Sequence, residues 1–174
     1  MLGGLDFPTE GSIKVGNKEL SRMNDEKLAA FRRRNIDFVF QQFNLIQTLN
    51  VRENIVLPIQ LDGGRIDETY FQEIVSLLKI EEKLTQLPNQ LSGGQQQRVA
   101  IARALASEAP VILADEPTGN LDEDTAMSIM QILEDSVYQM NKCAIIVTHS
   151  QEIAKRADVI FHLKRGTLQK IENN

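Results

Sequence analysis

The sequence predicts an α/β fold in which a mainly parallel sheet carries an inserted helical subdomain. Short, nearly continuous apolar runs at 111–115, 144–148 and 159–163 alternate with helical patterns, which is typical of a parallel sheet covered on both faces. Between about residues 43 and 87, apolar residues recur instead at helical spacing. We therefore predict one domain, 1–174, with an α/β core in 1–42 and 98–174 and a helical subdomain in 43–97.

The first 42 residues supply the front of this predicted core. Met1 to Asp6 contain two glycines after an apolar pair, which suits the C-terminal end of a helix. Residues 12–15 alternate as a half-buried strand, and residues 25–34 have a helical pattern. The run 36–40 is predicted as a strand that ends at Gln41.

Beyond Leu91 the predicted elements alternate regularly. A helix over 92–108 precedes strand 111–115, and a helix over 123–140 precedes strand 144–148. A short helix over 150–157 leads to 159–163, predicted as the last core strand, and Arg165-Gly166 turns into 168–171.

Composition excludes several classes of protein. No apolar run approaches the roughly 20 residues that span a bilayer, and no secretory signal pattern begins the chain. A net charge of −5 argues against a general nucleic-acid binder, and Arg32 to Arg34 are read as a solvated helix end. The single cysteine, Cys143, lies in an apolar run and is predicted to be a small buried hydrophobe.

The segment from Leu91 to Arg98 is predicted to bind an anion at the start of a helix. Ser92 is placed as the N-cap, with Gln95 at capping-box spacing. Gly93 and Gly94 leave the first turn bare, so that N–H groups and the positive end of the helix dipole face outward. The alternative is an ordinary helix start softened by glycine, which the following Gln-Gln-Gln-Arg and nearby apolar strand disfavour.

Two carboxylates, Asp115 and Glu116, follow the strand 111–115 directly. The carboxyl end of a parallel strand opens into the crevice where α/β sheets bind ligands. An aspartate there suits Mg²⁺, and a neighbouring glutamate can polarise a water for attack on a phosphoryl group. The alternative is a carboxylate that caps the turn before Pro117.

Two further polar residues follow predicted strands. His149 comes after strand 144–148, so it is predicted at the same sheet edge as Glu116, where it can contact a γ-phosphate or orient water. A lone histidine is more often structural, and the position at the end of the adjacent strand favours the functional reading. Gln41 can supply a neutral amide ligand to Mg²⁺, although glutamine at a strand end is common.

Taken in order, these motifs make the chain resemble the nucleotide-binding subunits of ABC transporters over nearly its whole length. The resemblance implies a P-loop NTPase-like core. The branch it is most similar to serves lipoprotein release, macrolide or antimicrobial-peptide export, and cell division. The motifs are the Q-loop at Val39-Phe40-Gln41, the signature at Leu91-Ser92-Gly93-Gly94-Gln95, Walker B with the catalytic glutamate at Ile112–Glu116, the D-loop at Asn120-Leu121-Asp122, and the switch histidine His149.

The resemblance implies a role for each matching residue. Glu116 would be the general base, His149 would contact the γ-phosphate, and Asp115 and Gln41 would hold or sense Mg²⁺ beside ATP. Ser92, Gly93, Gly94 and Gln95 would bind the nucleotide of the opposite subunit in a head-to-tail dimer, a homodimer or a pair with a second ATPase subunit, and Asp122 would couple the two sites. The helical block would receive an integral membrane permease, holding the subunit peripherally at the cytoplasmic face of the membrane.

The departure from the family lies at the front of the sequence. No Gly-Lys-Ser or Gly-Lys-Thr occurs in the 174 residues, so the lysine and backbone cradle of the Walker A loop are missing. We therefore expect an N-terminally truncated core with an apolar sheet edge exposed, inactive alone as an ATPase. The alternative is a non-catalytic docking protein that keeps the surface for the membrane subunit. A DNA-repair ATPase would need long coiled-coil insertions, and no sustained heptad run occurs.

Overall fold

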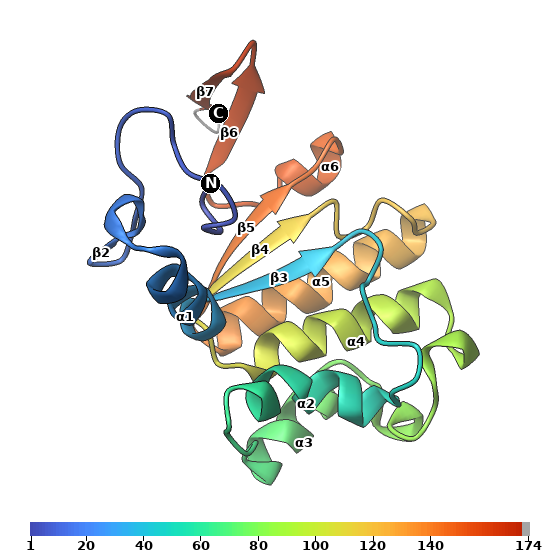
Figure 1. The fold of residues 1–174 in the computed structure, drawn as a ribbon. Coiled ribbons are helices and arrows are strands. Elements are labelled where there is room, and N and C mark those ends of the chain that lie inside the picture. The colour runs from blue at the N-terminus through green and yellow to red at the C-terminus, as the bar shows by residue number, and fades with distance from the viewer. Residues whose placement is uncertain (172–174) are drawn as a thin grey trace.

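The structure, a computed structural model, describes residues 1–171. Figure 1 shows its strands and helices in chain order. The strands are β1 (Lys14–Val15), β2 (Lys18–Glu19), β3 (Ile36–Phe40), β4 (Val111–Asp115), β5 (Cys143–Val147), β6 (Ile160–Lys164) and β7 (Thr167–Ile171). The helices are α1 (Asp25–Asn35), α2 (Val51–Leu61), α3 (Glu68–Leu77), α4 (Gly93–Ala106), α5 (Glu123–Gln139) and α6 (Gln151–Ala154), with short 3-10 helices at Leu20–Arg22, Glu81–Lys83 and Pro88–Gln90.

A parallel sheet in the order β3-β4-β5 forms the centre of the fold, as predicted. The three strands run level with one another, so that Phe40 pairs with Asp115 and Asp115 pairs with Val147. The chain therefore leaves all three strands at the same edge of the sheet. This register brings the segments after Phe40, Asp115 and Val147 together.

The main core lies between one face of the sheet and the helices α4 and α5 (Figure 1). Alternate strand residues point to this face, and Val39, Ile112 and Ala114 are buried there. Helix α4 contributes small residues such as Ala100 and Ala102, which are fully buried and allow close approach. The periodicity of two in the strands and of 3.6 in the helices thus converges on one apolar layer.

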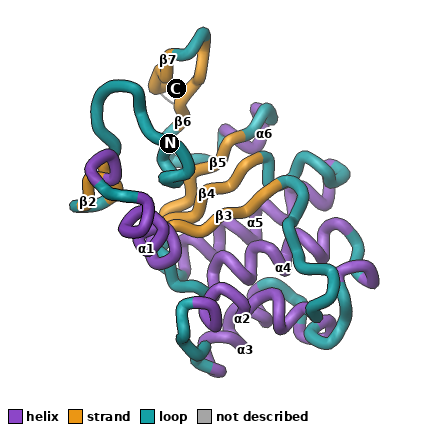
Figure 2. The backbone as a smooth tube through the Cα atoms, viewed as in Figure 1, coloured by secondary structure: helices purple, strands orange, loops and turns teal. Residues whose placement is uncertain are grey.

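Helices α2 and α3, both within the predicted helical block, form a further layer against α4 (Figure 2). Asn50 caps α2 through a capping box with Glu53. Helix α3 buries Phe71 and Ile74 at helical spacing. Helix α4 therefore lies between the sheet and the layer of α2 and α3, and its N-terminal turn carries the predicted anion site.

The second face of the sheet is more open than predicted. In β5, Ile145 is 39% exposed and Val147 is 58% exposed, and Cys143 is also exposed. The predictions of a sheet covered on both faces and of a buried Cys143 were therefore wrong. The reason is that β5 is an edge strand of the described sheet and these three side chains alternate onto the face away from α4 and α5.

The N-terminal segment covers part of that open face. A Cβ on Gly3 would lie 2.6 Å from the ring of Phe38 and 3.0 Å from Leu113. Residues 1–6, predicted as the C-terminal end of a helix, form a turn in which the Gly4 N–H donates to the Met1 carbonyl (2.8 Å). Gly4 has a φ of +61°, which glycine adopts without the steric penalty of a Cβ.

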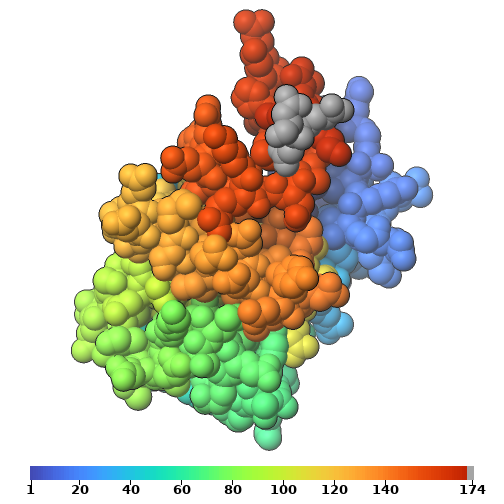
Figure 3. Space-filling view, turned by 180° about the vertical axis from the view of Figure 1, so that it is seen from behind, coloured from blue at the N-terminus to red at the C-terminus, as the bar shows by residue number. Residues whose placement is uncertain are grey.

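Two small hairpins lie outside the central sheet. Strand β1 is shorter than the predicted 12–15 and pairs with β2, which the sequence did not indicate. The prediction that 159–163 is a core strand was also wrong, because β6 pairs only with β7, antiparallel, within the described residues. Arg165 and Gly166 both have positive φ, which favours a tight two-residue hairpin turn. Figure 3 shows this hairpin projecting from the body of the molecule.

Candidate functional site

The predicted residues Glu116 and His149 do lie together at the carboxyl edge of the sheet. The Glu116 N–H donates to the carbonyl of Val147 (2.9 Å), which fixes the loop after β4 to the end of β5. The Thr148 hydroxyl donates to Oε2 of Glu116 (3.4 Å), and Nε2 of His149 is 3.6 Å from Oε1. Sequence reasoning missed Thr148, whose only signal was its place between a strand and His149.

Glu116 has an unusual backbone conformation and a buried carboxylate oxygen without a hydrogen bond. Its φ is +45°, a left-handed conformation that is strained for a residue with a side chain. Its Oε1 atom is buried and accepts no hydrogen bond from any residue that the structure describes. A buried acceptor without a donor is costly, so this oxygen is available to a water or a ligand. His149, with its side chain 98% exposed, lies beside this oxygen at the surface.

Asp115 is the last residue of β4 and its side chain is exposed. Within residues 1–171 no group of three or more His, Cys, Asp or Glu side chains is arranged to hold a metal. Mg²⁺ is bound in nucleotide sites by one or two carboxylates together with phosphate oxygens and waters. The donor set of one aspartate with a nearby glutamine amide therefore fits Mg²⁺ beside a nucleotide, and does not fit a cage made by protein alone.

Gln41 follows β3 directly and packs against the turn after Glu116. Its side chain bonds to Asn120, and a Cβ on Gly119 would lie 2.6 Å from its Nε2 atom. Gln41 is thus at the same sheet edge as Asp115 and Glu116, as predicted.

The start of α4 has the predicted capping box. The Ser92 hydroxyl accepts from the Gln95 N–H (3.3 Å), and Oε1 of Gln95 accepts from the Ser92 N–H (2.9 Å). Gly94 has a second function that the sequence did not indicate, because a Cβ there would lie 2.7 Å from Cγ2 of Thr125. The glycine therefore lets the first turns of α4 and α5 pack closely as well as leaving backbone N–H groups bare.

Asp122 lies next to this contact as the N-cap of α5. It accepts a hydrogen bond from the Thr125 N–H (3.0 Å), and this bond holds the pKa of Asp122 below its usual value. The predicted residues therefore fall into two groups. The sheet-edge group is Gln41, Asp115, Glu116 and His149, and the helix-start group is Ser92, Gly93, Gly94, Gln95 and Asp122. No hydrogen bond or ion pair joins the two groups in the described part of the chain.

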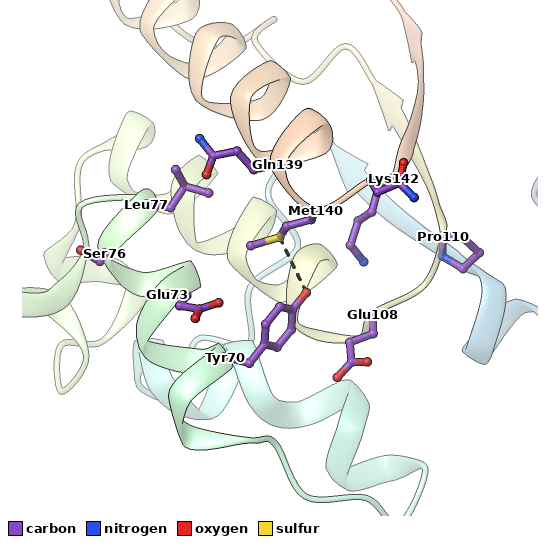
Figure 4. Close-up of a pocket in the computed structure, with 10 residues that line it drawn as sticks. Tyr70, Glu73, Ser76, Leu77, Glu108, Pro110, Gln139, Met140 and Lys142 are labelled. Atoms are coloured by element: carbon purple, nitrogen blue, oxygen red, sulfur yellow. Dashed lines mark hydrogen bonds between the residues drawn. The ribbon is translucent and has the colours of Figure 1, made fainter.

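A cavity of about 870 Å³ lies elsewhere, at the opposite edge of the sheet. Its lining includes Tyr70, Glu108 and Lys142, and Figure 4 shows these side chains around the end of α5. The Tyr70 hydroxyl bonds to the Leu105 carbonyl (3.0 Å) and lies 3.7 Å from the sulfur of Met140. None of the predicted site residues lines this cavity.

Comparison with known proteins adds to this geometry. The family described as "ABC transporter" matches residues 1–119. The lipoprotein-releasing system ATP-binding protein LolD of Legionella pneumophila is 39% identical over 171 residues, which are 97% of this chain and 75% of that protein. The macrolide export ATP-binding/permease protein MacB of Brucella melitensis is 41% identical over 170 residues, and this chain spans 26% of its length.

A solved structure is also similar. It is the dimeric post-hydrolysis state of the ATP-binding cassette MJ0796 of Methanocaldococcus jannaschii, bound to ADP and Pi. The two structures agree with a TM-score of 0.83 at 40% sequence identity, over 99% of this chain and 78% of that one. The predicted fold class is therefore confirmed.

Proposed function

This chain belongs to the ABC transporter ATP-binding family, whose cassettes are ATPases. We therefore propose that it binds and hydrolyses ATP to energise export or extraction of a substrate through a partner membrane subunit. The observation that carries the proposal is the Glu116 carboxylate. Its Oε1 atom is buried and accepts no hydrogen bond from the described residues, and the carboxylate lies beside Thr148 and His149 at the edge where the sheet opens.

In this proposal the sheet-edge group carries the chemistry. Glu116 accepts the proton of the attacking water through its free oxygen. Asp115 and Gln41 would hold Mg²⁺, which would neutralise the charge that develops on the phosphates. His149 donates to the γ-phosphate, for which its exposed side chain is suited.

The helix-start group needs a second copy or a second ATPase subunit. Since no hydrogen bond or ion pair joins Ser92–Gln95 to the sheet-edge group within the described chain, we propose that these residues serve the nucleotide of the facing subunit. The bare N–H groups of Gly93 and Gly94, at the positive end of α4, suit a γ-phosphate. Asp122, which caps α5 beside Thr125, would then link the two sites. The dimeric state of the solved relative supports this arrangement.

The membrane partner follows from the names of relatives. MacB is an ATP-binding/permease protein, and LolD is the ATP-binding part of a lipoprotein-releasing system. No helix in residues 1–171 is long and apolar enough to cross a membrane. We propose that the helical subdomain 43–97 is where a separate permease docks, so that the subunit sits peripherally on the cytoplasmic face of the membrane.

The test of Glu116 uses a chimera that joins this chain to the glycine-rich phosphate loop of a relative. Glu116→Gln is isosteric and cannot accept the proton, so ATP turnover should fall by at least about 10²-fold while nucleotide binding remains. The matched control is Glu108→Gln, an exposed glutamate at the opposite edge, which should leave turnover unchanged. Unchanged turnover in Glu116→Gln would remove Glu116 as the base.

A second test concerns the 174 residues by themselves. They contain no Gly-Lys-Ser or Gly-Lys-Thr, so we expect them to bind Mg-ATP very weakly and to hydrolyse almost none. Isothermal titration calorimetry that gives micromolar affinity would contradict this expectation. The alternative function, a docking protein without catalysis, would be supported by capture of a purified permease without turnover in the chimera.

A further inference from the structure

The chain passes through two strained residues where it leaves the sheet for the helical layer. Phe43 has a φ of +59° and Asn44 has a φ of +50°. The left-handed region is costly for a bulky side chain such as that of Phe43 and less so for asparagine, and two such residues in succession persist only where other contacts hold them.

Arg103, from the last turn of α4, supplies those contacts. Its Nη1 atom donates to the Asn44 carbonyl (2.7 Å), and its Nη2 atom donates to the Phe43 carbonyl (2.9 Å). A planar guanidinium can hold two neighbouring acceptors in a fixed geometry, which a lysine cannot do. The guanidinium of Arg103 therefore holds the carbonyl groups of both left-handed residues at once.

The chain is fixed firmly on both sides of this joint. Before it, Gln41 is bonded to Asn120. After it, the buried Asn54 of α2 accepts from the Ile46 N–H and donates to the carbonyls of Ile46 and Leu49. The two residues in between, Phe43 and Asn44, are thus the joint between the sheet edge and the layer of α2 and α3.

We propose that Arg103 is a clamp that holds this joint in its left-handed form and so sets the position of the helical layer relative to the sheet. In the described chain no hydrogen bond or ion pair joins Arg103 to the candidate site, and its two bonds go to backbone carbonyls, so it is a positioning residue. The inference goes beyond the proposed function, because it concerns the joint and requires no nucleotide. A result against Glu116 would leave it intact.

The test is NMR spectroscopy of the full chain. In Arg103→Met, the backbone couplings and carbon shifts of Phe43 and Asn44 should leave their left-handed values. The Ile46 amide should exchange with solvent about tenfold faster or more, as expected when charged hydrogen bonds are lost. Arg98→Met is the matched control, since Arg98 also lies on α4 and donates to a backbone carbonyl, that of Leu78 (3.1 Å). It should leave both signals unchanged.

Two further variants keep the proposal testable if Arg103→Met fails to fold. Arg103→Lys keeps the charge and reaches one carbonyl at a time, so Ile46 exchange should still rise. Asn44→Gly lowers the remaining cost of the left-handed conformation at residue 44, so in the Arg103→Met or Arg103→Lys background it should return the Phe43 signals part of the way to their wild-type values and slow the exchange again. Unchanged couplings and exchange in the arginine variants, or strictly additive effects with Asn44→Gly, would overturn the proposal.

Discussion

Gln41 and Asn120 hold each other through two hydrogen bonds of opposite direction. Nε2 of Gln41 donates to Oδ1 of Asn120 (3.1 Å), and Nδ2 of Asn120 donates to the backbone carbonyl of Gln41 (2.9 Å). The residues are 79 positions apart in the sequence. The amide proposed to reach Mg²⁺ is therefore oriented by the turn that follows the proposed base.

Asn120→Ala removes both bonds, so the Gln41 side chain should become mobile while the fold loses only about 1 kcal/mol, because the pair is exposed. The side-chain amide signals of Gln41 in a nitrogen-proton NMR spectrum should move to solvent-exposed positions. Asn120→Asp keeps the acceptor and loses the donor, so it should preserve the Gln41 side-chain signal. Identical Gln41 signals in wild type and Asn120→Ala would show that the pair does not form in solution.

Gly94→Ala should destabilise the protein by overpacking, because the new Cβ would lie 2.7 Å from Cγ2 of Thr125. Overpacking of this kind costs roughly 1–3 kcal/mol, which urea unfolding measures directly. Thr125→Ser removes the offending methyl group and keeps the backbone N–H that Asp122 accepts. The double variant should recover most of the loss. Equal losses in the single and double variants would mean that the effect of Gly94 does not come from this contact.

Asp37 should make stability fall as pH rises through the mildly acidic range. Burial raises its pKa from 3.8 to about 6, against the lowering effects of the Ser107 hydroxyl, which donates to it, and of Lys142 and Arg103. Between about pH 4 and 6 the native state therefore holds a proton that the unfolded chain has released. The stability lost across this window is on the order of 3 kcal/mol, and the loss is complete above about pH 6.

Urea unfolding of wild type and Asp37→Asn at several pH values checks this prediction. Asparagine does not titrate, so the stability of Asp37→Asn relative to wild type should rise by about 2 kcal/mol from pH 4.5 to pH 7. Ser107→Ala removes a bond that favours the carboxylate, so it should move the window to higher pH. Parallel stability profiles for wild type and Asp37→Asn would contradict the raised pKa.

Local patterns were sufficient for most of the elements. Strands 36–40 and 111–115 occur as predicted, and the helix starts at Ser92 and near Glu123 follow from caps encoded within three residues. Apolar residues at a period of two or of 3.6, and a side chain that caps its own helix, depend only on neighbours in the chain. For that reason the sequence alone was enough for the fold class and for the shared edge of Glu116 and His149.

The remaining features depend on contacts between distant residues, which only the tertiary structure decided. Strand 159–163 had the same apolar pattern as the core strands, yet it pairs with no strand of the central sheet in the described residues. Cys143 is exposed because of the face onto which β5 turns it. The grip of Arg103 on Asn44, 59 residues away, and the need for glycine beside Thr125 have no local signal. Periodicity specifies which side chains share a face, and packing in three dimensions determines what that face meets.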